Sequence, residues 1–360
     1  MTTDLILIID HRDTTVRMNG RALRVQRADA APEHVPLGVL GLVIVQGSPM
    51  VSCDVWRALA ERNIPAVLVP GRGRGQSALI GAALSNTIAL RAAQHRAAAD
   101  PGATLVIARH LVAAKLNAQI KVLEYLDRTG TAARKLVRQH LVSVDTLGSA
   151  HDNAAVMGVE GAAAAAWYAW LADCLAAHWR FSGRNRRPPL DPVNALLSLG
   201  YTLLGGEMLR AVQAHGLDPA MGFLHGMVPG RESLVLDLME PLRPSVDLVV
   251  LGLLDTRLEP CHFSFSQGDG CRLNKTGRGL FYSAWANTRP DWPDLFGTLT
   301  EQPETSLDED AERHDLPALC RRRVERLRTW LRPYLSAEAL VPTEENPSAA
   351  GGNEEESNDD

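Results

Sequence analysis

A change of hydrophobic period near residue 70 most constrains the fold of this chain. Before it, the apolar runs Leu5 to Ile9, Gly38 to Val45 and Ile64 to Val69 have the length and composition of strands. From Ser77 onward, apolar residues recur at helical spacing. The segment 70–75, Pro-Gly-Arg-Gly-Arg-Gly, breaks both patterns and reads as a flexible basic linker. The chain is therefore predicted to be an α+β protein.

The predicted boundaries follow from this change. A small N-terminal β-rich domain with its linker occupies residues 1–75, and a larger, mostly α-helical domain occupies residues 76–335. Alternating residues on both sides of Asn19-Gly20 predict a hairpin with a type I′ turn. One short helix is expected from Val55 to Arg62. A small sheet with exposed edges invites pairing, so we expect this domain to mediate dimerisation.

Helical patterns dominate the second domain. Ile107, Leu111 and Val122 lie on one apolar stripe, and Lys115 lies off it. Asp191 precedes a proline and is expected to cap a long helix. Pro241 should interrupt the helix that begins at Leu234. The remaining expected elements are helices over Thr131–Val144, Ala154–His178, Pro192–Gln213 and Leu316–Leu335, and a short hairpin between Cys261 and Phe281.

Charge and composition bound the partners and the compartment. Residues 336–360 are too polar to bury a core and are expected to be disordered. From Glu344 to Asp360 there are seven acidic residues and no lysine or arginine. The formal net charge is −5 for the whole chain, so it is −5 + 7 = +2 for the rest. A mildly basic body weakly favours a nucleic-acid partner. Five cysteines without CxxC spacing, no signal-peptide pattern and no membrane-length apolar run predict a cytoplasmic protein without a membrane anchor.

Candidate catalytic residues lie in one short stretch and one helix. His225, Asp237 and Glu240 fall within sixteen residues, and Glu160 stands at the start of an alanine-rich helix. Asp237 and Glu240 are three apart, so on a helix both could face one point. An imidazole nitrogen and carboxylate oxygens suit a divalent cation of the Mg²⁺ or Mn²⁺ type. The alternatives are a packed, hydrogen-bonded histidine and acids that favour a helix N-terminus.

Several motifs resemble one known family. They are Gly158-Val159-Glu160-Gly161 with Ala163 and Tyr168, Arg187-Pro188-Pro189 with Asp191 and Val193 to Leu197, Gly216 to Pro219, Gly222 to His225, and Gly230-Arg231 with Ser233-Leu234, Asp237 to Glu240 and Arg243-Pro244. In this order and spacing they resemble the CRISPR-associated spacer-acquisition integrase family, the endonucleases that insert new spacers into a CRISPR array. The N-terminal unit and Lys115, Asn117 and Gln119 also resemble that family.

The resemblance implies a function and a ligand set. It implies a metal-dependent DNA endonuclease and integrase that inserts spacers by attack of a 3′-hydroxyl on a phosphodiester. Glu160, His225 and Glu240 would bind Mg²⁺ or Mn²⁺, with Asp237 as a supporting or alternative carboxylate. The implied partners are double-stranded DNA (the spacer precursor and the CRISPR repeat), a second copy of the chain in a homodimer, and a small ferredoxin-like CRISPR adaptation protein.

Two other functions stay open from the residues alone. One is a nonspecific or branched-DNA repair nuclease that uses the same site, and the other is a non-catalytic DNA-binding assembly protein. Arginine clusters are candidate phosphate contacts in every case. They are Arg184, Arg186 and Arg187 before the Asp191 cap, and Arg321, Arg322, Arg323, Arg326 and Arg328 on the last helix.

Overall fold

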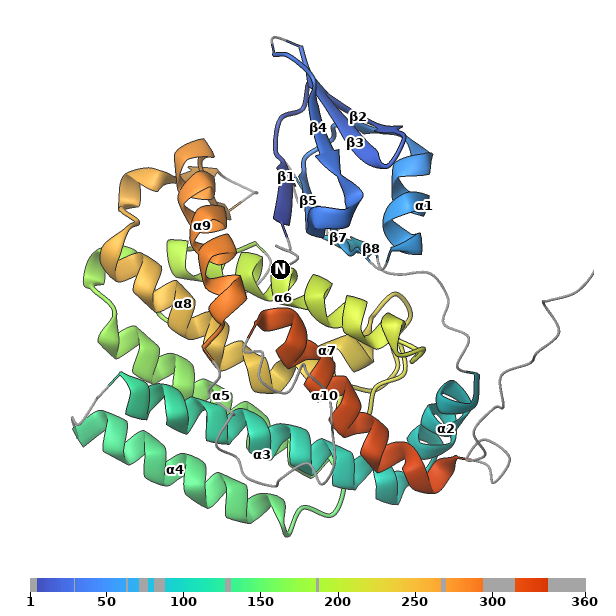
Figure 1. The fold of residues 1–360 in the computed structure, drawn as a ribbon. Coiled ribbons are helices and arrows are strands. Elements are labelled where there is room, and N and C mark those ends of the chain that lie inside the picture. The colour runs from blue at the N-terminus through green and yellow to red at the C-terminus, as the bar shows by residue number, and fades with distance from the viewer. Residues whose placement is uncertain are drawn as a thin grey trace, which may run out of the picture.

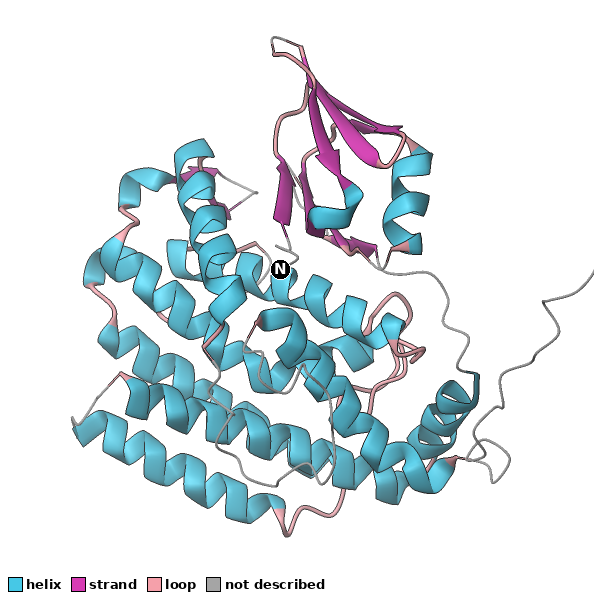
Figure 2. Ribbon diagram, in the orientation of Figure 1, coloured by secondary structure: helices cyan, strands magenta, loops and turns pink. Residues whose placement is uncertain are grey.

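The computed structural model describes residues 5–28, 30–62, 64–70, 77–80, 88–126, 131–185, 188–266, 270–293 and 315–335. A small β-rich unit lies on a larger body of helices, as Figures 1 and 2 show. The predicted α+β fold is thus confirmed. The linker arginines Arg72 and Arg74 and the predicted disordered tail lie outside the described residues.

Two four-stranded sheets build the β-rich unit. The first has the order β1-β5-β7-β8, from Leu5–Ile9, Leu40–Gln46, Ala66–Val69 and Ala78–Ile80. The second has the order β4-β3-β2-β6, from Glu33–Pro36, Ala22–Arg27, Thr14–Asn19 and Met50–Val51. Helix α1, Cys53–Glu61, covers their shared core. Because β8 pairs with β7, this unit extends to Ile80, five residues beyond the predicted boundary.

The hairpin between β2 and β3 corrects the predicted turn. Asn19 pairs with Ala22, so the two turn residues are Gly20 and Arg21 rather than Asn19 and Gly20. Gly20 has a φ of +62°, and Arg21 is not in the positive-φ region. A type I′ turn needs positive φ at both central residues, so this turn is of another type.

The central strand β5 joins the two parts of the protein. Val43 and Val45 point into the core of the β-rich unit, and Leu42 and Ile44 belong to the core of the helical body. Helix α6, Pro192–Ala214, packs against β7 and β8 on that side. A Cβ on Gly206 of α6 would stand 2.5 Å from a Val67 methyl group, so glycine permits this close approach.

Three long helices and their neighbours form the body around the site. Helix α3, Pro101–Tyr125, packs against α4, Thr131–Leu147, and α5, Asn153–Cys174. Further along the chain, α7, Ser233–Met239, is followed by a 3₁₀ turn, Glu240–Leu242, and by α8, Arg243–Thr256. The turn and α8 both pack on α3. The other α-helices and strands of the described residues are α2 (Ile88–Ala99), the hairpin β9–β10 (Phe263–Ser266 and Gly270–Leu273), α9 (Lys275–Thr288) and α10 (Leu316–Leu331).

The capping and interruption predictions hold. The Asp191 side chain accepts a 2.8 Å hydrogen bond from the amide of Asn194 at the start of α6. Helix α7 ends at Met239, where Pro241 removes the next amide donor.

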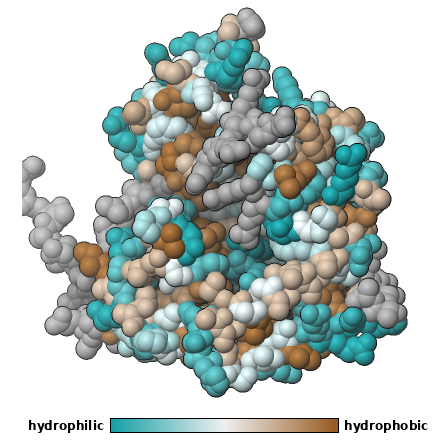
Figure 3. Space-filling view, turned by 180° about the vertical axis from the view of Figure 1, so that it is seen from behind, coloured by the Kyte–Doolittle hydropathy of each residue, from teal (hydrophilic) through white to brown (hydrophobic). Residues whose placement is uncertain are grey.

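Hydrophilic and hydrophobic residues are intermixed over the face that Figure 3 shows. In the described part of the chain, no helix combines the length and the apolar character that crossing a bilayer requires.

Candidate active site

The loop that carries His225 is folded around the carboxylate of Asp237. Asp237 Oδ2 accepts from the amides of Phe223, at 2.5 Å, and Leu224, at 2.9 Å. Asp237 Oδ1 accepts from the His225 amide at 2.9 Å and pairs with His225 Nδ1 at 2.7 Å. Four donors saturate a carboxylate that is fully buried. Asp237 is therefore a positioning residue for the loop and for the imidazole ring.

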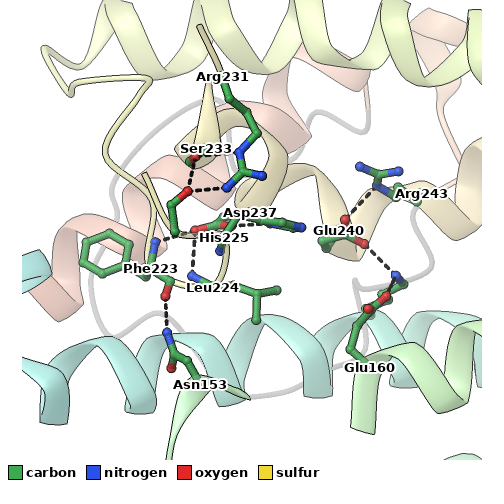
Figure 4. Close-up of polar contacts among 12 residues, drawn as sticks. Asn153, Glu160, Phe223, Leu224, His225, Arg231, Ser233, Asp237, Glu240 and Arg243 are labelled. Carbon is green, nitrogen blue, oxygen red and sulfur yellow. Dashed lines mark hydrogen bonds and ion pairs between the residues drawn. The ribbon is translucent and has the colours of Figure 1, made fainter. Parts of the chain in front are cut away.

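The hydrogen bond to Asp237 determines which nitrogen of His225 faces the site. The Asp237 carboxylate accepts a hydrogen bond, so His225 Nδ1 is the donor and carries a proton. In the neutral ring the lone pair then lies on Nε2. The ring extends from Asp237 toward Glu240 (Figure 4). An imidazole oriented by a carboxylate through its far nitrogen is the arrangement found at metal-binding histidines.

Further contacts hold the same loop from both sides. Asn153, at the start of α5, donates to the carbonyl oxygen of Phe223 at 2.6 Å. Ser233 Oγ donates to the Gly226 carbonyl at 2.9 Å, and Arg231 donates to the same oxygen. Asn153 was not among the residues predicted for the site. Its only local signal is its place next to the capping residue Asp152, which does not reveal a partner 70 positions away.

The second half of the site is a cluster of four charged side chains. The Lys115 ammonium of α3 bonds Glu160 Oε1 of α5 and, at 2.6 Å, Glu240 Oε2 of the 3₁₀ turn. Arg243 Nε lies 3.0 Å from the other oxygen of Glu240. The side chain of Glu240 is 6% exposed and that of Glu160 is 25% exposed, so solvent reaches the cluster mainly from the Glu160 side. Figure 4 shows Glu160 and Glu240 approaching each other from separate elements.

Buried charges in this cluster change the pKa values of their partners. Burial alone would raise the pKa of Glu240, but Arg243 and Lys115 outweigh it and lower that pKa to about 2. Burial alone would lower the pKa of Lys115, but Glu240 and Glu160 raise it. Near neutral pH the lysine is thus charged and Glu240 is ionised.

Two sequence predictions about this region need correction. Asp237 and Glu240 do not face one point, because α7 gives way to a 3₁₀ turn between them and each has its own set of partners. Lys115 was expected off the apolar stripe, yet it is 8% exposed, since α5 and the 3₁₀ turn, which carry the two glutamates it bonds, pack on α3.

Arg184, a predicted phosphate contact, bonds residues of α6 in the structure. Its guanidinium donates to Asn194 Oδ1 at 2.7 Å and to Ser198 Oγ at 3.1 Å, and it lies over the ring of Tyr201. These partners hold Arg184 against α6, and its phosphate contact stays a prediction. Arg186 and Arg187 lie outside the described residues.

A buried polar network behind the cluster was not predicted at all. Arg243 lies over the ring of Tyr201, at 4.7 Å from its centre, and the Tyr201 hydroxyl donates to Asp247. Trp167 Nε1 donates to the other oxygen of Asp247 at 2.9 Å. Burial raises the pKa of Asp247 to about 6. This network extends from the Glu240 side of the site into the core. Tyr201 and Asp247 meet because the helices that carry them, α6 and α8, pack together.

The side chains of the site offer oxygen and nitrogen donors of the kind that bind a divalent cation. Glu160 and Glu240 already share one cationic group, the Lys115 ammonium, and His225 has one ring nitrogen oriented by Asp237. Two carboxylates and an imidazole are suitable ligands for Mn²⁺ or Mg²⁺. Within the described ranges, no three His, Cys, Asp or Glu side chains are close enough together to form a ready-made metal cluster. Glu160, Glu240 and His225 thus suit the ion by the chemistry of their donor atoms, and the Lys115 ammonium lies between the two glutamates.

Comparison with known proteins identifies the family. Residues 7–287 match the family described as CRISPR associated protein Cas1. A CRISPR-associated endonuclease Cas1 from Rhodospirillum rubrum is 35% identical over 287 residues, which are 76% of this chain and 82% of that protein.

Solved structures agree at the level of the fold. A casposase bound to an integration product has a TM-score of 0.75 at 23% identity and covers 91% of this chain and 90% of its own. A Cas6-RT-Cas1–Cas2 complex has a TM-score of 0.75 at 20% identity and covers 94% of this chain and 36% of that one. The family match and the R. rubrum relative together confirm the resemblance stated from the motifs: the chain belongs to the Cas1 family of CRISPR-associated endonucleases and integrases.

Proposed function

We propose that this protein is a Mg²⁺- or Mn²⁺-dependent DNA endonuclease and integrase that inserts new spacers into a CRISPR array. Glu160, His225 and Glu240 would hold the ion, which when bound would offset charge on a phosphate and align a nucleophile. The observation that carries the proposal is the meeting of Glu160 and Glu240 on one cationic group beside the oriented His225.

The side chains around these ligands support that role. Asp237 keeps the His225 proton on Nδ1, so Nε2 remains available as a donor of electrons. Arg243, together with Lys115, keeps Glu240 ionised by lowering its pKa to about 2. The fold alone places these three side chains: Asp237 lies on α7, Lys115 on α3 and Arg243 on α8.

The proposed reaction exchanges one phosphodiester for another. A DNA 3′-hydroxyl attacks a phosphorus atom of the repeat, the new P–O bond forms as the old one breaks, and the released strand end takes a proton. The number of ester bonds is conserved, so no nucleoside triphosphate is needed. The casposase neighbour, which was solved with an integration product, supports this choice at the level of the fold.

We propose three partners for the same function: double-stranded DNA, a second copy of this chain, and a small Cas2 protein. The solved Cas6-RT-Cas1–Cas2 complex supports the last of these. Strand β1 and strand β4 form outer edges of the two sheets, which supports pairing of copies through the β-rich unit. Light scattering of the purified chain, alone and with a Cas2 protein, would measure both assemblies.

A strand-transfer assay tests the catalytic assignment. Glu160→Gln and His225→Ala are expected to lower joining of a 3′-ended duplex to a repeat substrate by about 100-fold or more, because each removes one ligand. Glu124→Gln is the matched control, since Glu124 is an exposed residue of α3 paired with Lys121. DNA affinity should change little in all three variants.

The products separate the candidate functions. Covalent joining that depends on Mg²⁺ or Mn²⁺ and on Glu160 supports the integrase. Cleavage by water alone would favour a branched-DNA repair nuclease. Joining at the parental rate by both Glu160→Gln and His225→Ala would show that the catalytic assignment is wrong.

A further inference from the structure

Lys115 is unusual among the cations of this chain. The sequence has 37 lysine and arginine residues, of which four are lysines: Lys115, Lys121, Lys135 and Lys275. Lys115 is buried at 8% exposure, whereas Lys135 and Lys275 are exposed and the Lys121 side chain is 38% exposed. A chain that uses arginine for most of its positive charge thus has a lysine at the centre of its candidate site.

The difference between the two side chains explains why this position suits lysine. An ammonium is a compact point charge with three donors, whereas a guanidinium is a planar fork that matches one carboxylate edge. Lys115 Nζ bonds one oxygen of Glu160 and one oxygen of Glu240, which come from different elements. Arg243 Nε lies 3.0 Å from the remaining Glu240 oxygen. The ammonium therefore has the contacts that a small inorganic cation would make.

The ammonium and a divalent ion would need the same oxygen atoms. Glu160 Oε1 and Glu240 Oε2 each direct a lone pair at Lys115. With Arg243 included, two acids and two basic groups make the cluster neutral. A divalent ion added without movement of Lys115 would give the cluster a net charge of +2 at a largely buried position, which is unfavourable. The two cations are thus alternatives at this site.

We propose that Lys115 is a built-in competitor for the divalent cation, which neutralises Glu160 and Glu240 until the ion displaces its ammonium. This inference rests on the proposed metal site and adds a determinant of its affinity. Lys115 lowers the affinity for the ion and, in return, stabilises the folded protein before the ion binds. The ion enters by exchange of one cation for another.

Manganese affinity of the full chain tests the proposal without an activity assay. Free Mn²⁺ is measured by its electron paramagnetic resonance signal in titrations of the parent, Lys115→Met and Lys121→Met. Lys115→Met removes the charge and keeps most of the stem, and Lys121→Met makes the same change on the exposed face of α3. We expect at least tenfold tighter Mn²⁺ binding by Lys115→Met and an unchanged dissociation constant for Lys121→Met. Equal or weaker binding by Lys115→Met would overturn the proposal.

A second measurement uses the parent protein and does not depend on the folding of a variant. With four lysines in the chain, the ¹⁵N-ammonium NMR spectrum contains few side-chain signals. We expect one slowly exchanging signal from the buried Lys115 ammonium. As Mg²⁺ is added, its chemical shift should approach that of the exposed lysines, or the signal should be lost to solvent exchange. A buried signal that persists unchanged at saturating Mg²⁺ would refute displacement.

Glutamate variants separate this proposal from the metal assignment beneath it. If Glu160→Gln and Glu240→Gln weaken Mn²⁺ binding while Lys115→Met does not strengthen it, the metal site stands and the competitor role falls. If neither glutamate variant changes Mn²⁺ binding, the metal assignment itself fails, and the role of Lys115 fails with it.

Discussion

Replacing Gly222 by alanine would test how the His225 loop is held. A Cβ at this position would stand 2.8 Å from Asp237 Oδ2, 2.9 Å from the His225 carbonyl oxygen and 2.9 Å from the Ser233 carbonyl carbon. Two of these three atoms belong to the backbone and cannot rotate away. The loop must therefore shift relative to α7, and the carboxylate that orients the imidazole must shift with it.

The expected magnitude follows from these contacts. Forcing one extra methyl group into a packed site costs about 1–3 kcal/mol in the free energy of unfolding. Loss of the residue that orients a metal-binding histidine typically costs about 10–100-fold in metal affinity or activity. We therefore expect Gly222→Ala to lose about 1–3 kcal/mol in urea unfolding and to join DNA about 10–100-fold more slowly than the parent.

Gly226→Ala is the matched control in the same loop. No heavy atom lies within 4 Å of a Cβ at Gly226, and neither glycine has a positive φ. We expect Gly226→Ala to change stability by less than about 1 kcal/mol and to leave strand transfer at the parental rate. If the two variants behave alike in both assays, contacts with Asp237 do not hold the loop in place.

Three further substitutions test the surrounding structure. Burial, and to a smaller extent the charge of Lys115, lowers the pKa of His140 to about 4 in the folded protein. As the pH falls below about 6.5, His140 therefore takes up a proton in the unfolded chain before it does so in the folded protein. Stability of the parent should therefore fall by about 3 kcal/mol between pH 6.5 and 4 relative to His140→Phe, as read from urea curves at each pH. Glu207→Gln should cost about 3–5 kcal/mol, because Glu207 bonds Arg289 at 2.5 Å inside the core, and calorimetry should show the loss. Asp191→Ala should cost about 0.5–2 kcal/mol in urea unfolding through the lost α6 cap, and a parental midpoint would contradict that role.

Features that depend on neighbouring residues were predictable from the sequence. The Asp191 cap, the end of α7 before Pro241 and the hairpin near Cys261 each follow from the chemistry of a few adjacent positions. The β2–β3 turn lies one residue further along the chain than predicted, because strand pairing and not the Asn-Gly pair alone sets the register.

Features that depend on packing between distant elements were less predictable. The motif resemblance identified Glu160, His225 and Glu240, but no local pattern shows that Lys115 joins two of them. Polarity places Lys115 outside an apolar stripe, and only the packing of α5 and the 3₁₀ turn on α3 explains its burial. For the same reason, the Tyr201–Asp247 network carried no signal, since its members come from α6 and α8.

The separate roles of Asp237 and Glu240 follow from one proline. In a continuous helix, residues three apart lie on neighbouring positions of one face, and both acids could then turn toward the imidazole. Pro241 has no amide hydrogen to bond the Asp237 carbonyl, so the Glu240 amide takes that bond and the chain tightens into a 3₁₀ turn. Asp237 then stays with the loop that it folds, and Glu240 reaches Lys115 and Arg243. A helix break of this kind lets two acids of one short segment serve different purposes: one orients the imidazole, and the other pairs with Lys115 and Arg243.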